Sequence, residues 1–499
     1  MPPFLCYDEM QLFFLRIINM IRKTIALLLS ALIIISCISP AIGAEMTRDD
    51  IIAASKAMAV QTNGLEGWPP GPAVGAGAAC LMDGDTGAVL YAKNMDEAHF
   101  PASTTKIMTC LIAAENCAMD EMVTFSKEAV FGIERGSSNV GIDVGQSMTM
   151  EECLYCILLE SANEVASAVA EHVGGSIEGF ADMMNERAAQ LGCTNTHFTN
   201  ANGLHNDLHY TTAHDLCVIG KAFFNNDLLR KISSTTSMTI YATPTQPDEF
   251  ICGNHHKMLP GKQYEYENIV GGKTGYTTVA HQTLITCAEK NGMTLVCAVM
   301  KDEAPYQYED TRDLFEYGFN NFRQLNVAEN ETGYRIETAD FFKTDIDIFK
   351  TSRDIFSLET SDRVTVPEHV DFGDLSSELE YDDSEDNSIL AMLHYSYNGI
   401  PVGTGHILLL NSTAAPFEFG VEPEAPRMTL TQEQTAEGRS VIYVNVRMVF
   451  IIIGIVLLLA IVIFVMQALL RNFAFASRRR RNIMKKNKRY KSEFDDFDF

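Results

Sequence analysis

Three short motifs hold the residues of this chain that are best suited to chemistry. In chain order they are Ser103-Thr104-Thr105-Lys106, Ser161-Ala162-Asn163 and Lys273-Thr274-Gly275. The first and third patterns each occur once, whereas a serine two residues before an asparagine also occurs at 137–139 and 396–398. The order of the three motifs along one chain, rather than any of them alone, therefore predicts a shared site.

The first two motifs supply a nucleophile, a base and a proton relay. Ser103 and Lys106 lie three residues apart, so their side chains share one face of a helix. A serine hydroxyl is a weak nucleophile until a base takes its proton, and a lysine desolvated among other cations can be neutral enough to be that base. Ser161 can relay a proton between the lysines and a leaving amine, and Asn163 can hold a substrate's backbone amide. This spacing predicts acyl transfer through an ester on Ser103.

The third motif supplies groups that bind the end of a substrate. Lys273 offers a positive charge and Thr274 a hydroxyl to a terminal carboxylate. Gly275 allows a substrate to lie against the strand edge as an added strand. The N–H of Tyr276 and that of Ser103, at a helix start, would bind the developing oxyanion. Taken singly, each motif also fits a purely structural role: a helix cap, a helix-surface amide and a strand leading into a turn.

Apolar periodicity and turn signals predict the elements that position these motifs. Helical patterns cover 101–115, 150–173, 177–191, 212–224 and 311–322. Strand-like runs cover 78–91, as two short strands around a turn at 83–87, and 268–274, 282–288 and 293–300. Beyond residue 325, short β-patterned runs alternate with acidic loops rich in Ser, Asn and Gly, which predicts a separate small β domain.

Charge is distributed unevenly along the 499 residues. The formal net charge is −27, but residues 471–499 hold ten basic and four acidic side chains, which leaves about −34 on residues 45–470. Such a surface repels nucleic acid and anionic lipid. Nucleic-acid binding is therefore a poor hypothesis, and any polyanionic partner must be recognised by short-range contacts.

Two apolar segments predict the location of the protein. The run at 24–35 follows two basic residues and ends in small residues, which predicts a secretory signal cleaved after Ala44. Met20 would head a signal of ordinary length, and a lipoprotein site at Cys37 is the alternative. A second run at 448–470 is long enough to span a bilayer and precedes the basic tail. By the positive-inside rule we expect that tail in the cytoplasm and the preceding chain outside, at the cell membrane.

The twelve cysteines do not predict a disulfide framework. Most lie inside apolar runs, where a cysteine behaves as a small buried hydrophobe. Cys153 and Cys156 form a C-x-x-C within a helical apolar pattern that has no second pair, so neither a zinc site nor a redox motif is favoured. The oxidation state of the cysteines stays open.

The segments around the motifs resemble the low-molecular-mass penicillin-binding D-alanyl-D-alanine carboxypeptidases. The resemblance spans 75–325, and the matching segments are 101–109, 161–166, 196–198, 202–204, 209–213 and 272–277. It implies an α+β fold of the β-lactamase/transpeptidase type, in which a five-stranded antiparallel sheet is flanked by helices and joined by a helical lobe. Members of this family often have glycine where His281 stands, and they usually anchor by an amphipathic C-terminal helix instead of a transmembrane helix.

The resemblance also implies a function and a domain order. We expect a serine-type carboxypeptidase that removes the terminal D-alanine of peptidoglycan stem peptides during cell-wall synthesis. Such an enzyme is acylated by β-lactams and needs no metal or cofactor. The expected domains are a signal with its extension (1–44), a linker (45–74), the catalytic domain (75–325), a small β-rich domain (326–437), a linker (438–447), a transmembrane helix (448–470) and a cytoplasmic tail (471–499).

Four other functions share some of these features. A D,D-endopeptidase uses the same chemistry on cross-links, and the motifs do not separate the two. A serine β-lactamase needs a glutamate after the second motif to activate water, and none occurs between Glu186 and Glu249. A zinc D,D-peptidase would need histidine ligands, and the candidates are His205, His209, His214, His255 and His256. None of them forms H-E-x-x-H, and a non-catalytic wall-binding protein is disfavoured because the motif side chains are intact.

Overall fold

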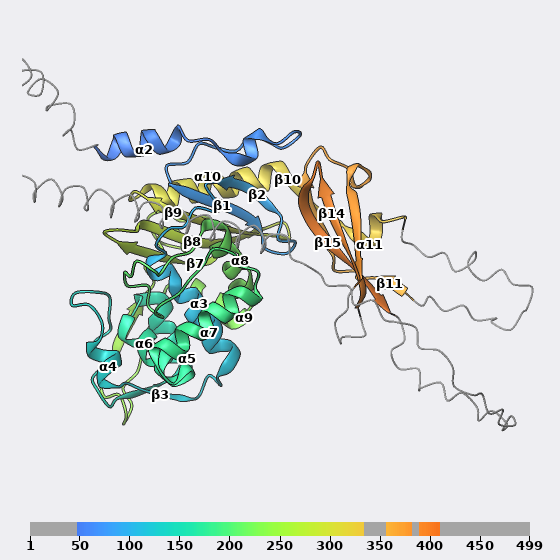
Figure 1. Cartoon of the computed structure of the whole chain (residues 1–499). Helices are drawn as coiled ribbons and strands as arrows, with labels where there is room; N and C mark the ends of the chain where they lie inside the picture. The colour runs from blue at the N-terminus through green and yellow to red at the C-terminus, as the bar shows by residue number, and fades with distance from the viewer. Residues whose placement is uncertain (1–46, 334–355, 382–388, 410–499) are drawn as a thin grey trace, which may run out of the picture. The chain divides into compact units, whose positions relative to one another are not determined.

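The structure, a computed structural model, describes residues 47–333, 356–381 and 389–409. Its first sheet has five antiparallel strands in the order β2-β1-β9-β8-β7 (Figure 1). The strands are β1 (Ala78–Asp83), β2 (Val89–Lys93), β7 (Ile269–Thr277), β8 (His281–Lys290) and β9 (Met293–Asp302). All five predicted strand runs are therefore confirmed, and β7, which carries the third motif, lies at an edge of the sheet.

Helices cover both faces of this sheet. Along β9, Val296 and Ala298 pack into one apolar core together with helix α8 (Ala213–Phe224), whereas Cys297 and Val299 pack into a second core with helix α10 (Tyr306–Asn321). This separation follows from the alternation of side chains along a strand. The five-stranded antiparallel sheet with flanking helices agrees with the α+β, transpeptidase-like fold that the resemblance implied.

A helical lobe follows the first motif. Its helices are α3 (Lys106–Asn116), α4 (Lys127–Phe131), α5 (Met150–Tyr155), α6 (Asn163–Gly174), α7 (Ile177–Gln190) and α9 (Asp227–Ser234). Two short hairpins accompany them, β3 (Met122–Thr124) with β4 (Ser147–Thr149) and β5 (Ser237–Ile240) with β6 (Phe250–Gly253). Helix α2 (Arg48–Lys56) precedes the sheet in the chain, and Thr47 and Asp50 form a capping box at its N-terminus.

The prediction of a single long helix at 150–173 is wrong. After α5, residues Cys156–Glu160 form a π-helical turn, and the N–H of Ser161 donates to the Cys156 carbonyl. Ser161 then adopts left-handed dihedral angles, φ 61° and ψ 30°, before α6 begins at Asn163. The apolar residues on both sides of the break are buried, so the hydrophobic period runs through it and does not reveal it.

A second antiparallel sheet follows α10 in the chain. Its order is β10-β12-β15-β14-β13, with β11 paired to β15. The strands are β10 (Phe322–Asn326), β11 (Phe356–Leu358), β12 (Arg363–Pro367), β13 (Ser376–Tyr381), β14 (Ile389–Tyr397) and β15 (Ile400–Leu409). The short helix α11 (Val327–Asn330) lies between β10 and β11 in the chain.

The predicted targeting and membrane segments lie outside the described residues. Both the signal at 1–44 and the transmembrane segment at 448–470 fall in that part of the chain. Among the residues that the structure describes, none of the helices has the length and apolar character needed to cross a membrane.

Candidate active site

Ser103 lies in a tight turn immediately before α3. The turn, Ala102–Thr105, is a 3-10 helix, and Ala102 adopts a left-handed φ of 49°. Two threonine side chains close it, because Thr104 Oγ1 donates to the Pro101 carbonyl at 2.7 Å and Thr105 Oγ1 donates to the Ala102 carbonyl at 2.8 Å. The nucleophile candidate is therefore held at the N-terminal end of α3, where backbone N–H groups lack helical partners.

Lys106 is completely buried beside Ser103. Its Nζ lies 3.1 Å from Ser103 Oγ, and it donates to Asn163 Oδ1 at 2.6 Å and to the Asn202 carbonyl at 2.5 Å. Burial, and secondly the charge of Lys273, hold the pKa of Lys106 well below its usual value. Both effects favour the neutral amine, which is the form that can accept a proton from Ser103.

The second motif contributes from the break between α5 and α6. Ser161 is buried, and its Oγ has no hydrogen-bond partner among the residues that the structure describes. The Ser161 hydroxyl, on a residue with left-handed backbone angles, is therefore free to form hydrogen bonds with a substrate. Asn163 is also buried, and its Oδ1 accepts from Lys106 Nζ. The motif pattern had suggested only a substrate contact for Asn163.

The third motif packs directly against the Ser103 turn. A Cβ added to Gly275 would lie 2.2 Å from Thr283 Oγ1, 2.9 Å from the Ser103 backbone N and 3.0 Å from the Pro101 carbonyl oxygen. Thr283 Oγ1, from the neighbouring strand β8, donates to the Pro101 carbonyl at 2.8 Å. Glycine is thus required at 275 so that β7 can approach the Ser103 turn, a reason that the spacing of the motif did not reveal.

The remaining residues of β7 differ strongly in exposure. Lys273 is buried, its Nζ donates to the Thr274 carbonyl at 3.0 Å, and burial lowers its pKa to about 8. Tyr276 has 61% of its surface exposed. Because β7 is an edge strand, its outer side is available for pairing with an extended peptide.

The strand after β7 begins with His281, the position where the resemblance led us to expect glycine. His281 adopts a left-handed φ of 58°, and its Nδ1 lies 2.6 Å from Glu303 Oε1. A glycine takes this backbone conformation at little cost, whereas a histidine is strained there. The ion pair or hydrogen bond with Glu303 offsets part of that strain.

His209 belongs to a buried hydrogen-bond network that the motifs did not predict. His209 Nδ1 accepts the N–H of Thr199 at 3.0 Å, so Nε2 carries the proton and donates to Thr105 Oγ1 at 2.8 Å. Burial lowers the pKa of His209 to about 3. This neutral histidine braces the turn that holds the nucleophile, and both ring nitrogens are engaged, which leaves neither for a metal.

Glu164, directly after the second motif, is another residue whose contacts the motifs did not predict. Its Oε1 accepts the N–H groups of Val140 at 2.6 Å and Gly141 at 3.0 Å, and the side chain is buried. Burial raises its pKa. The neighbouring Asn163 N–H donates to the Ser138 carbonyl at 2.9 Å, so the loop is tied to the start of α6 at two points.

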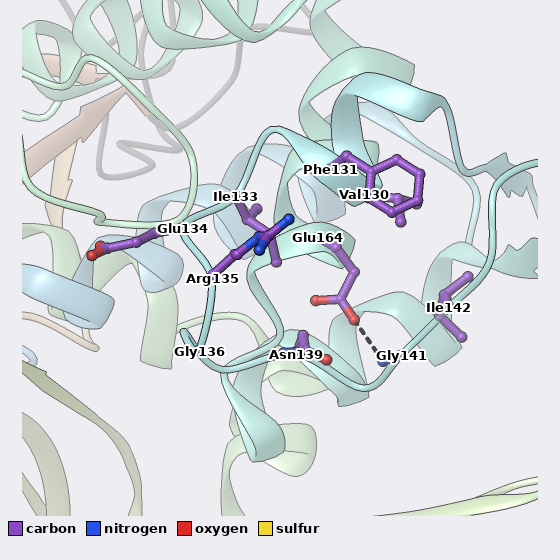
Figure 2. Close-up of a pocket in the computed structure, with 10 residues that line it drawn as sticks. All are labelled: Val130, Phe131, Ile133, Glu134, Arg135, Gly136, Asn139, Gly141, Ile142 and Glu164. Atoms are coloured by element: carbon purple, nitrogen blue, oxygen red, sulfur yellow. Dashed lines mark hydrogen bonds between the residues drawn. The ribbon is translucent and has the colours of Figure 1, made fainter.

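This loop borders a pocket of about 290 Å³, and Figure 2 shows Glu164 reaching into it. The lining residues are Val130, Phe131, Ile133, Glu134, Arg135, Gly136, Asn139, Gly141, Ile142 and Glu164. The only local signal for this arrangement is an acidic residue in the first turn of a predicted helix, which has the simpler explanation of favourable helix-dipole interactions.

Fold and site together define a class of protein: one that carries a Ser–Lys pair on a transpeptidase-like scaffold. The family model described as D-alanyl-D-alanine carboxypeptidase, peptidase S11, matches residues 67–304. Two relatives are D-alanyl-D-alanine carboxypeptidases. DacB2 of Mycobacterium tuberculosis is 32% identical over 54% of this chain and 90% of its own length. DacF of Bacillus subtilis is 31% identical over 49% of this chain and 62% of its own length. The chain therefore belongs to the D-alanyl-D-alanine carboxypeptidase family.

A solved structure supports the fold independently of close sequence similarity. The D-alanyl-D-alanine carboxypeptidase DacD from Francisella tularensis superposes with a TM-score of 0.51 and 20% identity, over 69% of this chain and 94% of that chain. At this identity the likeness concerns the fold alone.

Proposed function

We propose that this chain is a serine-type D-Ala-D-Ala carboxypeptidase that removes the terminal D-alanine from peptidoglycan pentapeptide stems. The observation that carries the proposal is the distance of 3.1 Å between Ser103 Oγ and the Nζ of a completely buried Lys106. A lysine with a lowered pKa in contact with a serine is a base next to its nucleophile. Membership of the family agrees with this activity.

Acylation starts with the extended end of the stem peptide along the outer side of β7. Its terminal carboxylate binds Lys273 and Thr274, which brings the penultimate D-alanine carbonyl to Ser103. Ser103 Oγ attacks that carbonyl carbon while neutral Lys106 takes the hydroxyl proton. The N–H groups of Ser103 and Tyr276 bind the oxyanion.

The tetrahedral intermediate then collapses and the acyl group is released. The C–N bond breaks as the leaving nitrogen receives the proton from Lys106, relayed by the Ser161 hydroxyl, so that free D-alanine departs. A water molecule attacks the ester, its proton returns through the same base, and the tetrapeptide leaves with Ser103 regenerated. No metal or cofactor takes part in these steps.

A penicillin distinguishes this activity from that of a β-lactamase. Its strained amide should acylate Ser103, and the opened ring keeps the leaving nitrogen in the site, where it hinders the entry of water. Mass spectrometry should show one long-lived adduct per chain, and a pentapeptide ending in D-Ala-D-Ala should release D-alanine. Ser103→Ala should show neither result. Rapid turnover of penicillin by the unaltered chain would favour the β-lactamase, and labelling of Ser103→Ala would mean that the nucleophile is misassigned.

The same site chemistry also allows a D,D-endopeptidase, which differs in the substrate and not in the steps. In a cross-linked dimer the leaving group is a second stem peptide in place of a single D-alanine, so a much bulkier group must fit beside Lys273 and Thr274. We therefore expect faster release of D-alanine from the pentapeptide than cleavage of a cross-linked peptide. A reversed ratio of kcat/KM for the two substrates would assign the endopeptidase activity instead.

The strands from β10 to β15 are further proposed to form a separate β domain. The catalytic domain is proposed to lie outside the cell, anchored by the apolar segment 448–470. The apolar run and the ten basic residues of the tail support this topology. Proteinase added to intact wall-stripped cells should degrade residues 45–446 and spare the tail. Survival of the ectodomain under these conditions would contradict this topology.

A further inference from the structure

Three metal-ligating side chains of different kinds meet at a point away from the three motifs. They are Cys117 at the C-terminal end of α3, Glu121 just before β3, and His172 in the last turn of α6. One ligand atom from each lies within 4.8 Å of the other two, and Glu121 Oε2 is 3.1 Å from His172 Nε2. All three side chains are partly exposed, so an ion can reach them from solvent.

The spacing fits a tetrahedral zinc ion. Zinc binds nitrogen and oxygen at about 2.0–2.1 Å and sulfur at about 2.3 Å, which places a nitrogen and an oxygen ligand about 3.3 Å apart and a sulfur about 3.6 Å from either. The Glu121 to His172 distance of 3.1 Å already matches the first separation. The Cys117 sulfur lies within 4.8 Å of the other two ligand atoms, so a shift of about 1 Å at most would bring it to the separation that zinc requires.

Two features prepare this point for a cation. Glu121 Oε1 accepts the N–H of Ala118 at 2.7 Å, which fixes the carboxylate and leaves Oε2 facing His172. Helices α3 and α6 both end here, since Cys117 is the C-cap of one and His172 lies three residues from the cap of the other. Helix C-terminal ends carry partial negative charge, which favours a positive ion.

The Cys117 thiol is accessible to a metal ion, because it is only partly buried. Among the ten described cysteines, all of them unbridged thiols, only Cys117 and Cys193 are partly exposed.

We propose that Cys117, Glu121 and His172 form a structural site for a zinc ion, with water as the fourth ligand. The site ties together the distal ends of the two helices whose first residues are Lys106 and Asn163. With 11 residues in α3, the ion lies about 16 Å along the helix from the base and takes no part in acyl transfer. The zinc therefore stabilises the packing of these two helix ends and does not contact the catalytic groups.

Metal substitution tests the site in the purified full chain. After removal of metals with a chelator, Co²⁺ should produce a thiolate-to-cobalt charge-transfer band, and one equivalent of Zn²⁺ should bleach it. Saturating Zn²⁺ should raise the Tm by about 5 °C. Cys117→Ser and His172→Gln should lose both the band and the rise in Tm, whereas Cys193→Ser, the matched thiol control, should keep them.

Other outcomes would overturn the assignment. Absence of the cobalt band from the unaltered chain, or its persistence in Cys117→Ser, would remove the site. Metal-free chain should still be acylated by penicillin on Ser103, because the ion is distant from the reacting atoms. Loss of acylation on removal of zinc, with recovery on its return, would contradict the structural role. If both variants fail to fold, the metal-free unaltered chain still decides the matter through the cobalt band and the Tm.

Discussion

Replacing Gly275 by alanine tests whether strand β7 sets the position of the nucleophile. The new Cβ would approach Thr283 Oγ1 to 2.2 Å and the Ser103 backbone N to 2.9 Å, whereas ordinary contacts begin near 3.4 Å. Thr283 can rotate away, but the backbone of the turn must recede by about half an ångström. Because a misplacement of about 1 Å can cost about 10²-fold in rate, we expect acylation to fall roughly 10- to 100-fold.

The effect on stability should be small by comparison. Rotation of Thr283 breaks its bond of 2.8 Å to the Pro101 carbonyl, but that oxygen still accepts from Thr104 Oγ1 at 2.7 Å. The free energy of unfolding should therefore fall by only about 1 kcal/mol.

The assay is the second-order rate of labelling by a fluorescent penicillin, with thermal unfolding measured in parallel. Gly64→Ala is the control, since a Cβ there meets no atom within 4 Å. A Gly275→Ala rate within threefold of the unaltered chain would refute the idea that β7 positions Ser103.

Three further changes probe the base, its electrostatics and the loop. Lys106→Arg keeps the charge, but a guanidinium does not lose its proton in a protein, so acylation should fall roughly 10²- to 10⁴-fold with the Tm retained; normal penicillin labelling would exclude Lys106 as the base. Because Lys106 must be neutral, the rate of acylation should fall as the pH drops through the lowered pKa of Lys106. Lys273→Met removes one cause of that lowering, so the acidic limb of the pH–rate profile should move to higher pH. An unmoved limb would show that Lys273 does not act on Lys106. Glu164→Ala removes the acceptor of two loop N–H groups and should slow acylation, whereas Glu164→Gln keeps an acceptor oxygen and should be close to normal; equal rates for the two variants would show that these bonds do not matter.

Much of the catalytic domain was predictable from local pattern. Apolar strand-like runs bounded by turn signals located all five strands of the first sheet, and the 3.6-residue period located α7 and α8. The order of the three motifs indicated the chemistry, because Ser103 and Lys106 lie three residues apart and so share one face of a helix. These features depend on residues a few positions apart, which is the range over which dihedral preference and amphipathicity act.

Contacts between segments far apart in the chain determined the features of the site that local pattern did not predict. The partners of Lys106 lie 57 and 96 residues away, at Asn163 and Asn202, and only folding buries the amine among them and lowers its pKa. The turn that breaks the predicted helix at Ser161 is invisible in the hydrophobic period, because a buried π turn keeps the same apolar composition. The need for glycine at 275 comes from the Ser103 turn 172 positions earlier in the chain. Composition and spacing thus determined which groups this protein can use, and tertiary packing decided their protonation and their distances, because both depend on burial and on neighbours that local sequence does not specify.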